Sequence, residues 1–344
     1  MQVAVRKIGI APAPPFLYIG IIHYLGTQKN DIIIQVKKQV SSEELFVRVL
    51  LTGGSGFIGR NMMENASESF SFLAPRHQEL DITDEASVRA WFSHNPVDAV
   101  IHSATKPGHR NASDPTNIAI TNLHMFSNLF EASQKAQISR FIFLGSGCEY
   151  DMQNYSPKMD EKSLGEHIPA DDTGFSKYIC TRIMQGVPGY INVRFFGIFG
   201  KYEDYAIRFI SNAICKALFD LPITLRQDRR FDYTSASDGV RAIKRFLEVP
   251  TNRLTYTDYN VTPDESIGLL EIALLVKKVA GKPDLPVIVG ETGQGREYSG
   301  KNERFMQLFP DFSFTAMEES VQMLYDWYAS RMDQLDREKL LVDK

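Results

Sequence analysis

The sequence predicts an α/β fold, a doubly wound parallel sheet followed by a smaller C-terminal α/β lobe. Two observations predict it. From residue 47 onward, short apolar runs alternate with longer stretches of helical period, which is typical of a parallel sheet with helices on both faces. The first run, Val47 to Leu51, is followed at once by glycines at regular spacing.

The expected elements follow one another in a regular order. After the strand 47–51, a helix is expected from about Gly56. We then expect a strand over 69–74, a helix over 85–93 capped by Thr83, a strand over 99–102, a helix over 118–135, a strand over 140–144, a helix over 174–185, a strand over 190–194 and an amphipathic helix over 209–218.

The composition narrows the functional classes. The chain has 344 residues and a formal net charge of −4, so we expect no nucleic-acid partner. The longest apolar run near the N-terminus, Phe16 to Leu25, is shorter than the ~20 residues that span a membrane, so we expect no membrane partner. Three cysteines without metal-ligand spacing indicate no metal site and a reducing, cytoplasmic compartment.

The glycine-rich segment is the strongest motif. Residues 52–60 read Thr-Gly-Gly-Ser-Gly-Phe-Ile-Gly-Arg. Gly53 permits a tight turn, Gly56 lets the backbone approach a pyrophosphate, and Gly59 lets the helix pack against the strand. Phe57 and Ile58 belong to the same binding segment. Because the motif follows a strand and opens a helix, it predicts a Rossmann-type domain that binds a dinucleotide.

The second strand bears on the choice between NAD and NADP. NAD-binding proteins usually carry an acidic residue at its end, whereas this strand ends in Leu73-Ala74-Pro75-Arg76. Arg76, or Arg60, could face a 2′-phosphate, and the alternative is a solvated surface arginine. We therefore favour NADP.

Several segments together resemble the extended short-chain dehydrogenase/reductase family, NAD-dependent epimerase/dehydratase type, and within it the GDP-fucose synthase and dTDP-4-dehydrorhamnose reductase branches. The resemblance runs from about Val47 to Tyr328. Besides the glycine motif, it is carried by residues 76–84, 97–105, 141–150, 172–177 and 299–314.

The resemblance implies how the cofactor would be held. Asp81 and Ile82 would contact the adenine, and Asn122 would brace the strand beside the nicotinamide ribose. The small residues that line this ribose would be Ser103, Ala104 and Thr105. Arg226 and Arg230 would lie near the diphosphate of a nucleotide-sugar substrate, and a homodimer would form through the two helices beside the active site.

The resemblance also implies a catalytic serine at Ser146 and an active-site lysine at Lys177. The tyrosine that the family places four residues before the lysine is replaced here by Thr173, and a threonine hydroxyl is far too weak an acid to replace a phenol. Three hypotheses stay open. In the first, another acid supplies the proton, and the candidates are Cys148, Glu149, Tyr150, Asp171 and Asp172. In the second, Thr173 binds the substrate while a substrate group or water supplies the proton. In the third, the protein binds the cofactor without catalysing a reaction.

These observations predict the domain organisation. Residues 47–200, with 233–262 returning to them, would form the dinucleotide-binding domain, 201–232 and 263–330 the substrate lobe, and 331–344 a tail. Residues 1–46 show no clear period beyond a strand candidate at 31–36. They are either an untranslated stretch before a start at Val47 or a genuine extension. The expected activity is hydride transfer near C4 of a nucleotide-activated sugar, and the alternative is a binding or regulatory subunit.

Overall fold

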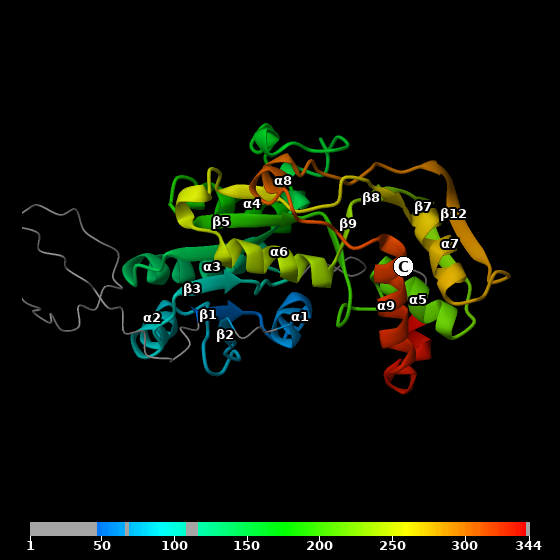
Figure 1. Ribbon diagram of the computed structural model, residues 1–344, viewed down its shortest axis with the longest axis horizontal. Helices are drawn as coiled ribbons and strands as arrows, with labels where there is room; N and C mark the ends of the chain where they lie inside the picture. The colour runs from blue at the N-terminus through cyan, green and yellow to red at the C-terminus, as the bar shows by residue number, and fades with distance from the viewer. Residues whose placement is uncertain (1–46, 66–68, 108–115, 342–344) are drawn as a thin grey trace, which may run out of the picture. The chain divides into compact units, whose positions relative to one another are not determined.

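A computed structural model describes residues 47–65, 69–107 and 116–341 of the chain (Figure 1). The N-terminal extension, with its strand candidate at 31–36, lies outside the described residues. Within the described part of the chain, no helix combines the length and the apolar character that crossing a bilayer requires.

The main sheet has six strands in the order β10-β5-β4-β3-β1-β2, and all of its neighbouring strands are parallel. From β1 the chain passes to β2 on one side and then to β3 on the other, so the strand order reverses beside β1. Ligands of doubly wound sheets bind at such a reversal, beyond the carboxyl ends of the strands. The strands are β1 (Val47–Thr52), β2 (Phe70–Leu73), β3 (Ala99–His102), β4 (Arg140–Ser146), β5 (Tyr190–Phe195) and β10 (Asp258–Asn260).

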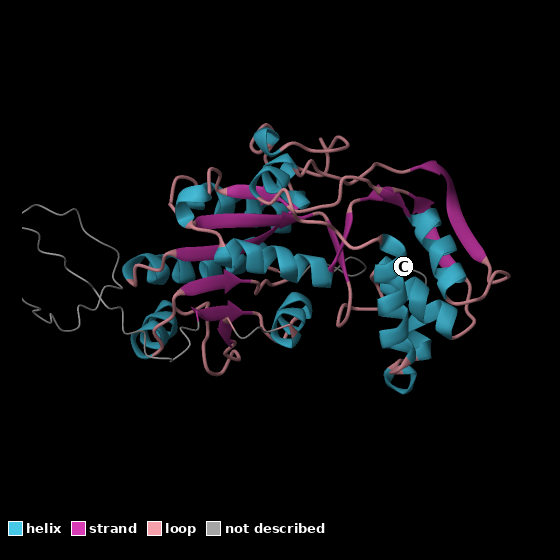
Figure 2. Ribbon diagram, in the orientation of Figure 1, coloured by secondary structure: helices cyan, strands magenta, loops and turns pink. Residues whose placement is uncertain are grey.

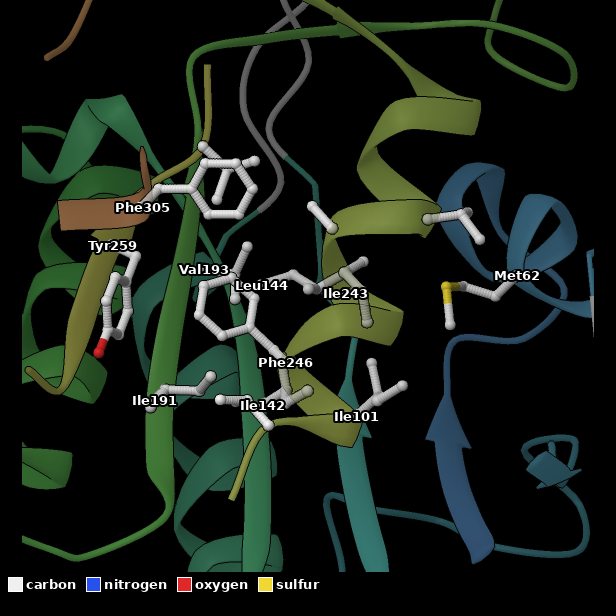
Figure 3. Close-up of a cluster of buried hydrophobic side chains, with 14 of the residues drawn as sticks. Met62, Ile101, Ile142, Leu144, Ile191, Val193, Ile243, Phe246, Tyr259 and Phe305 are labelled. Carbon is white, nitrogen blue, oxygen red and sulfur yellow. The ribbon is translucent and has the colours of Figure 1, made fainter. Parts of the chain in front are cut away.

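Helices cover both faces of this sheet because its strands are apolar on both sides. Val49 and Leu51 of β1 point to one face, where α1, α6 and α8 pack, and Figure 3 shows Phe246 and Ile243 of α6 against that face. Leu50 points to the opposite face, where α2, α3 and α4 pack. These helices are α1 (Phe57–Glu64), α2 (Glu85–His94), α3 (Ile118–Lys135), α4 (Asp172–Met184), α6 (Ala236–Glu248) and α8 (Glu303–Leu308).

A second core forms where three helices pack together with a two-stranded parallel sheet (Figure 2). Its elements are α5 (Phe209–Leu218), α7 (Leu269–Val279), α9 (Met317–Ala329), β7 (Ile223–Asp228) and β12 (Val287–Gln294). Short pairs complete the sheets: β6 (Gly197–Phe199) with β9 (Tyr233–Ser235), and β8 (Arg230–Phe231) with β11 (Ile267–Gly268). Single 3₁₀ turns occur at η1 (Gly147–Tyr150), η2 (Glu161–Ser163), η3 (Thr251–Arg253), η4 (Met332–Gln334) and η5 (Arg337–Leu340).

The predicted fold class is confirmed, and several details are corrected. Thr83 does not cap α2; the cap is Asp84, whose carboxylate accepts from the backbone N–H groups of Ala86 and Ser87. Strand β2 spans Phe70–Leu73, one residue shorter at each end than the expected 69–74, and residues 76–84 form turns. Strand β4 continues to Ser146, and α4 begins at Asp172, two residues before the expected start.

Candidate functional site

The glycine motif forms a tight turn between β1 and α1. Gly53 has φ of 72°, and a Cβ there would lie 2.8 Å from the backbone nitrogen of Ala104. A Cβ on Gly59 would collide with the carbonyl of Gly53. No side chain caps α1 at Gly56, so the N–H groups of its first turn are left for a ligand. The shape and the donors of this turn fit a dinucleotide pyrophosphate.

The end of β3 lies directly beside this turn. Thr52 Oγ1 is 2.8 Å from His102 Nδ1 and accepts from the Ala104 N–H at 3.3 Å. Asn122 of α3 accepts the N–H of Lys106 at 2.7 Å and the hydroxyl of Thr105 at 3.4 Å. The side chain of Asn122 therefore ties α3 to the segment that follows β3.

Lys177 of α4 lies over the carboxyl end of β4. Its Nζ donates to the Leu144 carbonyl at 2.6 Å and lies 5.0 Å from the Phe143 ring centroid. Burial, and then the charge of Lys177, lower the pKa of His102 to about 3, so the imidazole is neutral. A small pocket brings these elements together and is lined by His102, Ala104, Thr105, Asn122, Phe143, Ser176, Lys177 and Cys180.

Ser146 ends β4 and begins the 3₁₀ turn η1. Its N–H donates to Glu149 Oε1 at 2.9 Å, and its Oγ accepts from the Cys148 N–H at 3.4 Å. The Oγ also lies 3.3 Å from the hydroxyl of Tyr298. Tyr298 was missed by the sequence analysis because it lies 152 residues further along the chain, and no local motif marks it.

The predicted alternative acids differ in their surroundings. Burial raises the pKa of the half-buried Cys148 thiol to about 11, against a smaller opposing hydrogen bond to Ser146, so it stays protonated near neutral pH. Asp171 caps α4 by accepting from the Gly174 N–H at 2.8 Å. Asp172 Oδ2 lies 3.5 Å from the Ala119 nitrogen of α3, so both carboxylates contact helix N-termini. Thr173 is half-buried one turn before Lys177.

Glu149 and Tyr150 are both engaged in a buried network around Arg194. Glu149 Oε2 accepts from Arg194 Nη2 at 2.9 Å, and the Tyr150 hydroxyl accepts from Arg194 Nη1 at 2.7 Å. Asp258 of β10 lies 3.2 Å from the same guanidinium. Burial would lower the pKa of Arg194, but the charges of Glu149 and Asp258 and the hydrogen bond to Glu149 raise it instead. This network holds η1, β5 and β10 together beneath Ser146.

The residues expected at the adenine end lie in the turns after β2. Arg76 is exposed, and its backbone N–H donates to Glu79 at 2.7 Å. Asp81 accepts the Thr83 hydroxyl at 2.6 Å, while Ile82 is buried and its carbonyl accepts from Asn128 at 3.0 Å. The Arg76 guanidinium is thus exposed beside a well-ordered turn.

The two arginines expected near a substrate diphosphate carry acidic partners. Arg226 of β7 bonds Glu291 of β12 at 2.7 Å, and its side chain is 82% exposed. Arg230 of β8 bonds Glu271 at 2.9 Å and also contacts Ser266. Either arginine would exchange these partners on binding a phosphate. Within the described residues, no cluster of acidic, histidine or cysteine side chains could hold a metal ion.

Two relatives with names that denote sugar-nucleotide synthases match different shares of the chain. The GDP-L-fucose synthase of Azorhizobium caulinodans is 25% identical over 254 residues, covering 68% of this chain and 81% of that protein. The GDP-L-colitose synthase of Yersinia pseudotuberculosis is 26% identical over 133 residues, covering 38% of this chain and 43% of that protein. The chain thus spans less than half of the second relative.

Solved structures share the fold. A GDP-mannoheptose C4 reductase from Campylobacter jejuni with NADP bound superposes with a TM-score of 0.71 at 18% identity, covering 82% of this chain and 98% of that one. A dTDP-4-dehydrorhamnose reductase from Bacillus anthracis in complex with NADP gives 0.70 at 20% identity, covering 83% and 100%. The model of the NAD dependent epimerase/dehydratase family matches residues 49–262, and the chain belongs to that family.

Proposed function

We propose that this protein is an NADP-dependent oxidoreductase or epimerase that acts by hydride transfer near C4 of a nucleotide-activated sugar. The observation that carries the proposal is the small pocket that joins Lys177 to the ends of β3 and β4. The names of the relatives support the substrate class, since they are GDP-sugar synthases. The solved neighbours that contain NADP support the cofactor.

In this proposal the glycine turn holds the pyrophosphate, and Arg76 binds the 2′-phosphate. Asp81 and Ile82 contact the adenine. NADP, when bound, supplies or removes the hydride. The segment of Ser103, Ala104 and Thr105 lines the nicotinamide ribose, braced by Asn122.

Lys177 binds the ribose hydroxyls, and its positive charge favours the ionised form of a nearby acid. Ser146 Oγ hydrogen-bonds the reacting oxygen of the sugar. Arg226 and Arg230 bind the diphosphate, which a planar guanidinium fork suits well. Sugar and cofactor then meet at the carboxyl ends of the strands.

The alternative function is a binding or regulatory subunit that holds NADP without turnover. The observation that favours it is Thr173, since the family's tyrosine is absent there. The two functions differ in one measurable respect, which is whether NADPH is consumed in the presence of a sugar nucleotide.

The test incubates the protein with NADPH and a panel of GDP- and dTDP-linked 4-keto sugars and follows NADPH oxidation. We expect turnover that Lys177→Ala lowers by about 10²-fold or more, because ribose placement and the charge beside the reacting oxygen are both lost. Lys135→Ala is the matched control, since Lys135 lies in α3 and pairs only loosely with Glu131, at 3.6 Å. Tight NADPH binding without turnover by the native protein would instead support the binding subunit.

We further propose that the protein works in the cytoplasm as a homodimer formed through α3 and α4. These helices lie in contact on one face of the sheet. They expose Ile120, Phe175 and Ile183 to solvent, and the described cysteines are free thiols.

A further inference from the structure

The hydroxyl of Tyr298 lies 3.3 Å from Ser146 Oγ. We propose that Tyr298 is the catalytic acid that gives a proton to the reacting oxygen, in place of the tyrosine missing at Thr173. This inference rests on the proposed function. In that function Ser146 Oγ contacts the reacting oxygen, so a phenol beside Ser146 comes within reach of the same atom.

The chain segment around Tyr298 is held firmly. Its backbone N–H donates to the Arg230 carbonyl at 2.9 Å, and its carbonyl accepts from the Asp232 N–H at 3.2 Å. The ring lies 5.1 Å from that of Tyr155 and 5.4 Å from that of Phe196, measured between centroids. With both ends of the residue fixed, the hydroxyl has a defined position, as an acid–base group requires.

Two glycines permit this approach. A Cβ on Gly147 would lie 2.7 Å from the Tyr298 hydroxyl, and a Cβ on Gly300 would collide with the Phe196 ring. Because Gly147 and Gly300 have no side chain, there is room for the Tyr298 phenol and the Phe196 ring. Tyr298 is buried, at 7% exposure, which shields its proton transfer from bulk water.

The other candidate groups are less suited to the task. Glu149 and Tyr150 are bound to Arg194 in the interior, and Asp171 caps α4. Burial raises the pKa of the Cys148 thiol to about 11, above the ~10 of an ordinary phenol, so the thiol is the weaker proton donor. Tyr298 instead presents a phenol, the same acid that Thr173 lacks, to the oxygen of Ser146.

Lys177 can support this acid electrostatically. Its charge acts on Cys148, which lies two residues after Ser146 in η1. A positive charge favours the phenolate that remains after proton transfer. The lysine would therefore assist Tyr298 even though the two residues come from different parts of the chain.

The carbonyl carbon of the sugar receives a hydride from NADPH, and the π electrons of the C=O bond move to the oxygen. This oxygen takes the proton of Tyr298, whose O–H bond breaks. After the alcohol product leaves, water enters the emptied site and returns a proton to the phenolate. The ketone is reduced to an alcohol, and the cofactor is oxidised to NADP⁺.

The test compares Tyr298→Phe with Tyr155→Phe. Tyr155 is the matched control because it belongs to the same aromatic cluster and its hydroxyl donates to the Ser299 carbonyl. We expect Tyr298→Phe to lower kcat by about 10²- to 10⁴-fold, with unchanged NADPH affinity and thermal midpoint. The control should change kcat far less, because the Tyr155 hydroxyl contacts a backbone carbonyl rather than Ser146. Adding Thr173→Tyr to Tyr298→Phe should restore part of the rate.

A second readout does not depend on turnover. In an ultraviolet tyrosinate titration of the native protein, the ionisation of one phenol should move to lower pH when NADP⁺ is added, because the positive nicotinamide favours a phenolate near it, and Tyr298→Phe should lack this movement. A native enzyme whose kcat survives Tyr298→Phe would overturn the inference and leave the proposed function standing. If the native protein turns over no sugar, the proposed function fails, and identical tyrosinate titrations of the two proteins would overturn the role of Tyr298 as well.

Discussion

At the scale of single residues, Asp232 is a buried carboxylate that ties three chain segments together. Its side chain has no exposed surface, accepts from Lys158 Nζ at 2.9 Å, and accepts from the Gly300 N–H at 2.8 Å. Burial raises its pKa from 3.8 to about 6, against smaller opposing effects of these hydrogen bonds. The folded protein therefore holds this proton more tightly than the unfolded chain does.

This raised pKa predicts that the folded protein becomes less stable as the pH rises. As the pH rises from 3.8 to about 6, the native state keeps a proton that the unfolded chain releases, so the free energy of unfolding falls. We expect native stability, relative to Asp232→Asn, to fall by up to about 3 kcal/mol across this window. Urea unfolding at a series of pH values measures it.

The control for this prediction is Asp311→Asn. Asp311 has its pKa lowered from 3.8, mainly by its hydrogen bond with Arg245, so it is already ionised throughout the window. The stability of the native protein relative to this variant should change little there, and only upward, as the unfolded chain loses the Asp311 proton just above pH 3.8. If the stability of the native protein relative to Asp232→Asn stays constant or rises with pH, the prediction is wrong.

The residue scale also shows where sequence reasoning reaches its limit. Thr173 could be recognised as a missing acid because its spacing to Lys177 is local in the chain. Tyr298 could not be found in the same way, since only the fold brings it to Ser146. Its neighbours in sequence, Glu297 and Ser299, carry no signal that points to β4.

At the scale of elements, the Arg194 network decides how β4, β5 and β10 meet. Glu149 accepts Arg194 at 2.9 Å, Thr181 at 2.9 Å and Asn192 at 2.8 Å, and its other oxygen accepts the Ser146 N–H. Glu149→Gln would leave Asp258 as the charged partner of Arg194. It would also turn an amide NH₂ group toward side chains that donate hydrogen bonds. We expect a loss of about 3–5 kcal/mol in the free energy of unfolding, measured by urea denaturation, and a lower kcat because Ser146 loses its support.

The matched control for Glu149→Gln is Glu131→Gln, which removes the charge of an exposed carboxylate that lies 3.6 Å from Lys135 Nζ. Its effect should remain within about 0.5 kcal/mol, since exposed pairs stabilise little. Equal losses for the two variants would show that burial of the Arg194 network adds no stability.

The sequence predicted elements best where an apolar period was uninterrupted. The ranges 99–102, 118–135 and 209–218 agree with β3, α3 and α5 in every residue. The ends that were wrong depend on side-chain hydrogen bonds, as at Asp84, or on pairing with distant strands. Strand β4 continues to Ser146 because Ser146 pairs with Phe195 of β5, a partner that periodicity alone does not reveal.

At the scale of the whole molecule, the proposed homodimer accounts for an apolar surface on α3 and α4. Ile120 is 57% exposed, Phe175 36% and Ile183 44%. The first turns of the two helices are adjacent, since Asp172 contacts the Ala119 nitrogen at 3.5 Å. A second copy of this face would cover these side chains, as a two-fold symmetric interface does.

The variant Ile120→Glu/Ile183→Glu tests this dimer. Light scattering of the native protein should give twice the chain mass of 39.0 kDa, and the variant should give a single chain, because carboxylates at the centre of an interface would lose their hydration without a partner. Met323→Glu is the control, since Met323 is an equally exposed apolar residue, at 46%, on α9. Loss of the dimer in the control alone would place the interface on α9, and a native protein of single-chain mass would contradict the dimer altogether.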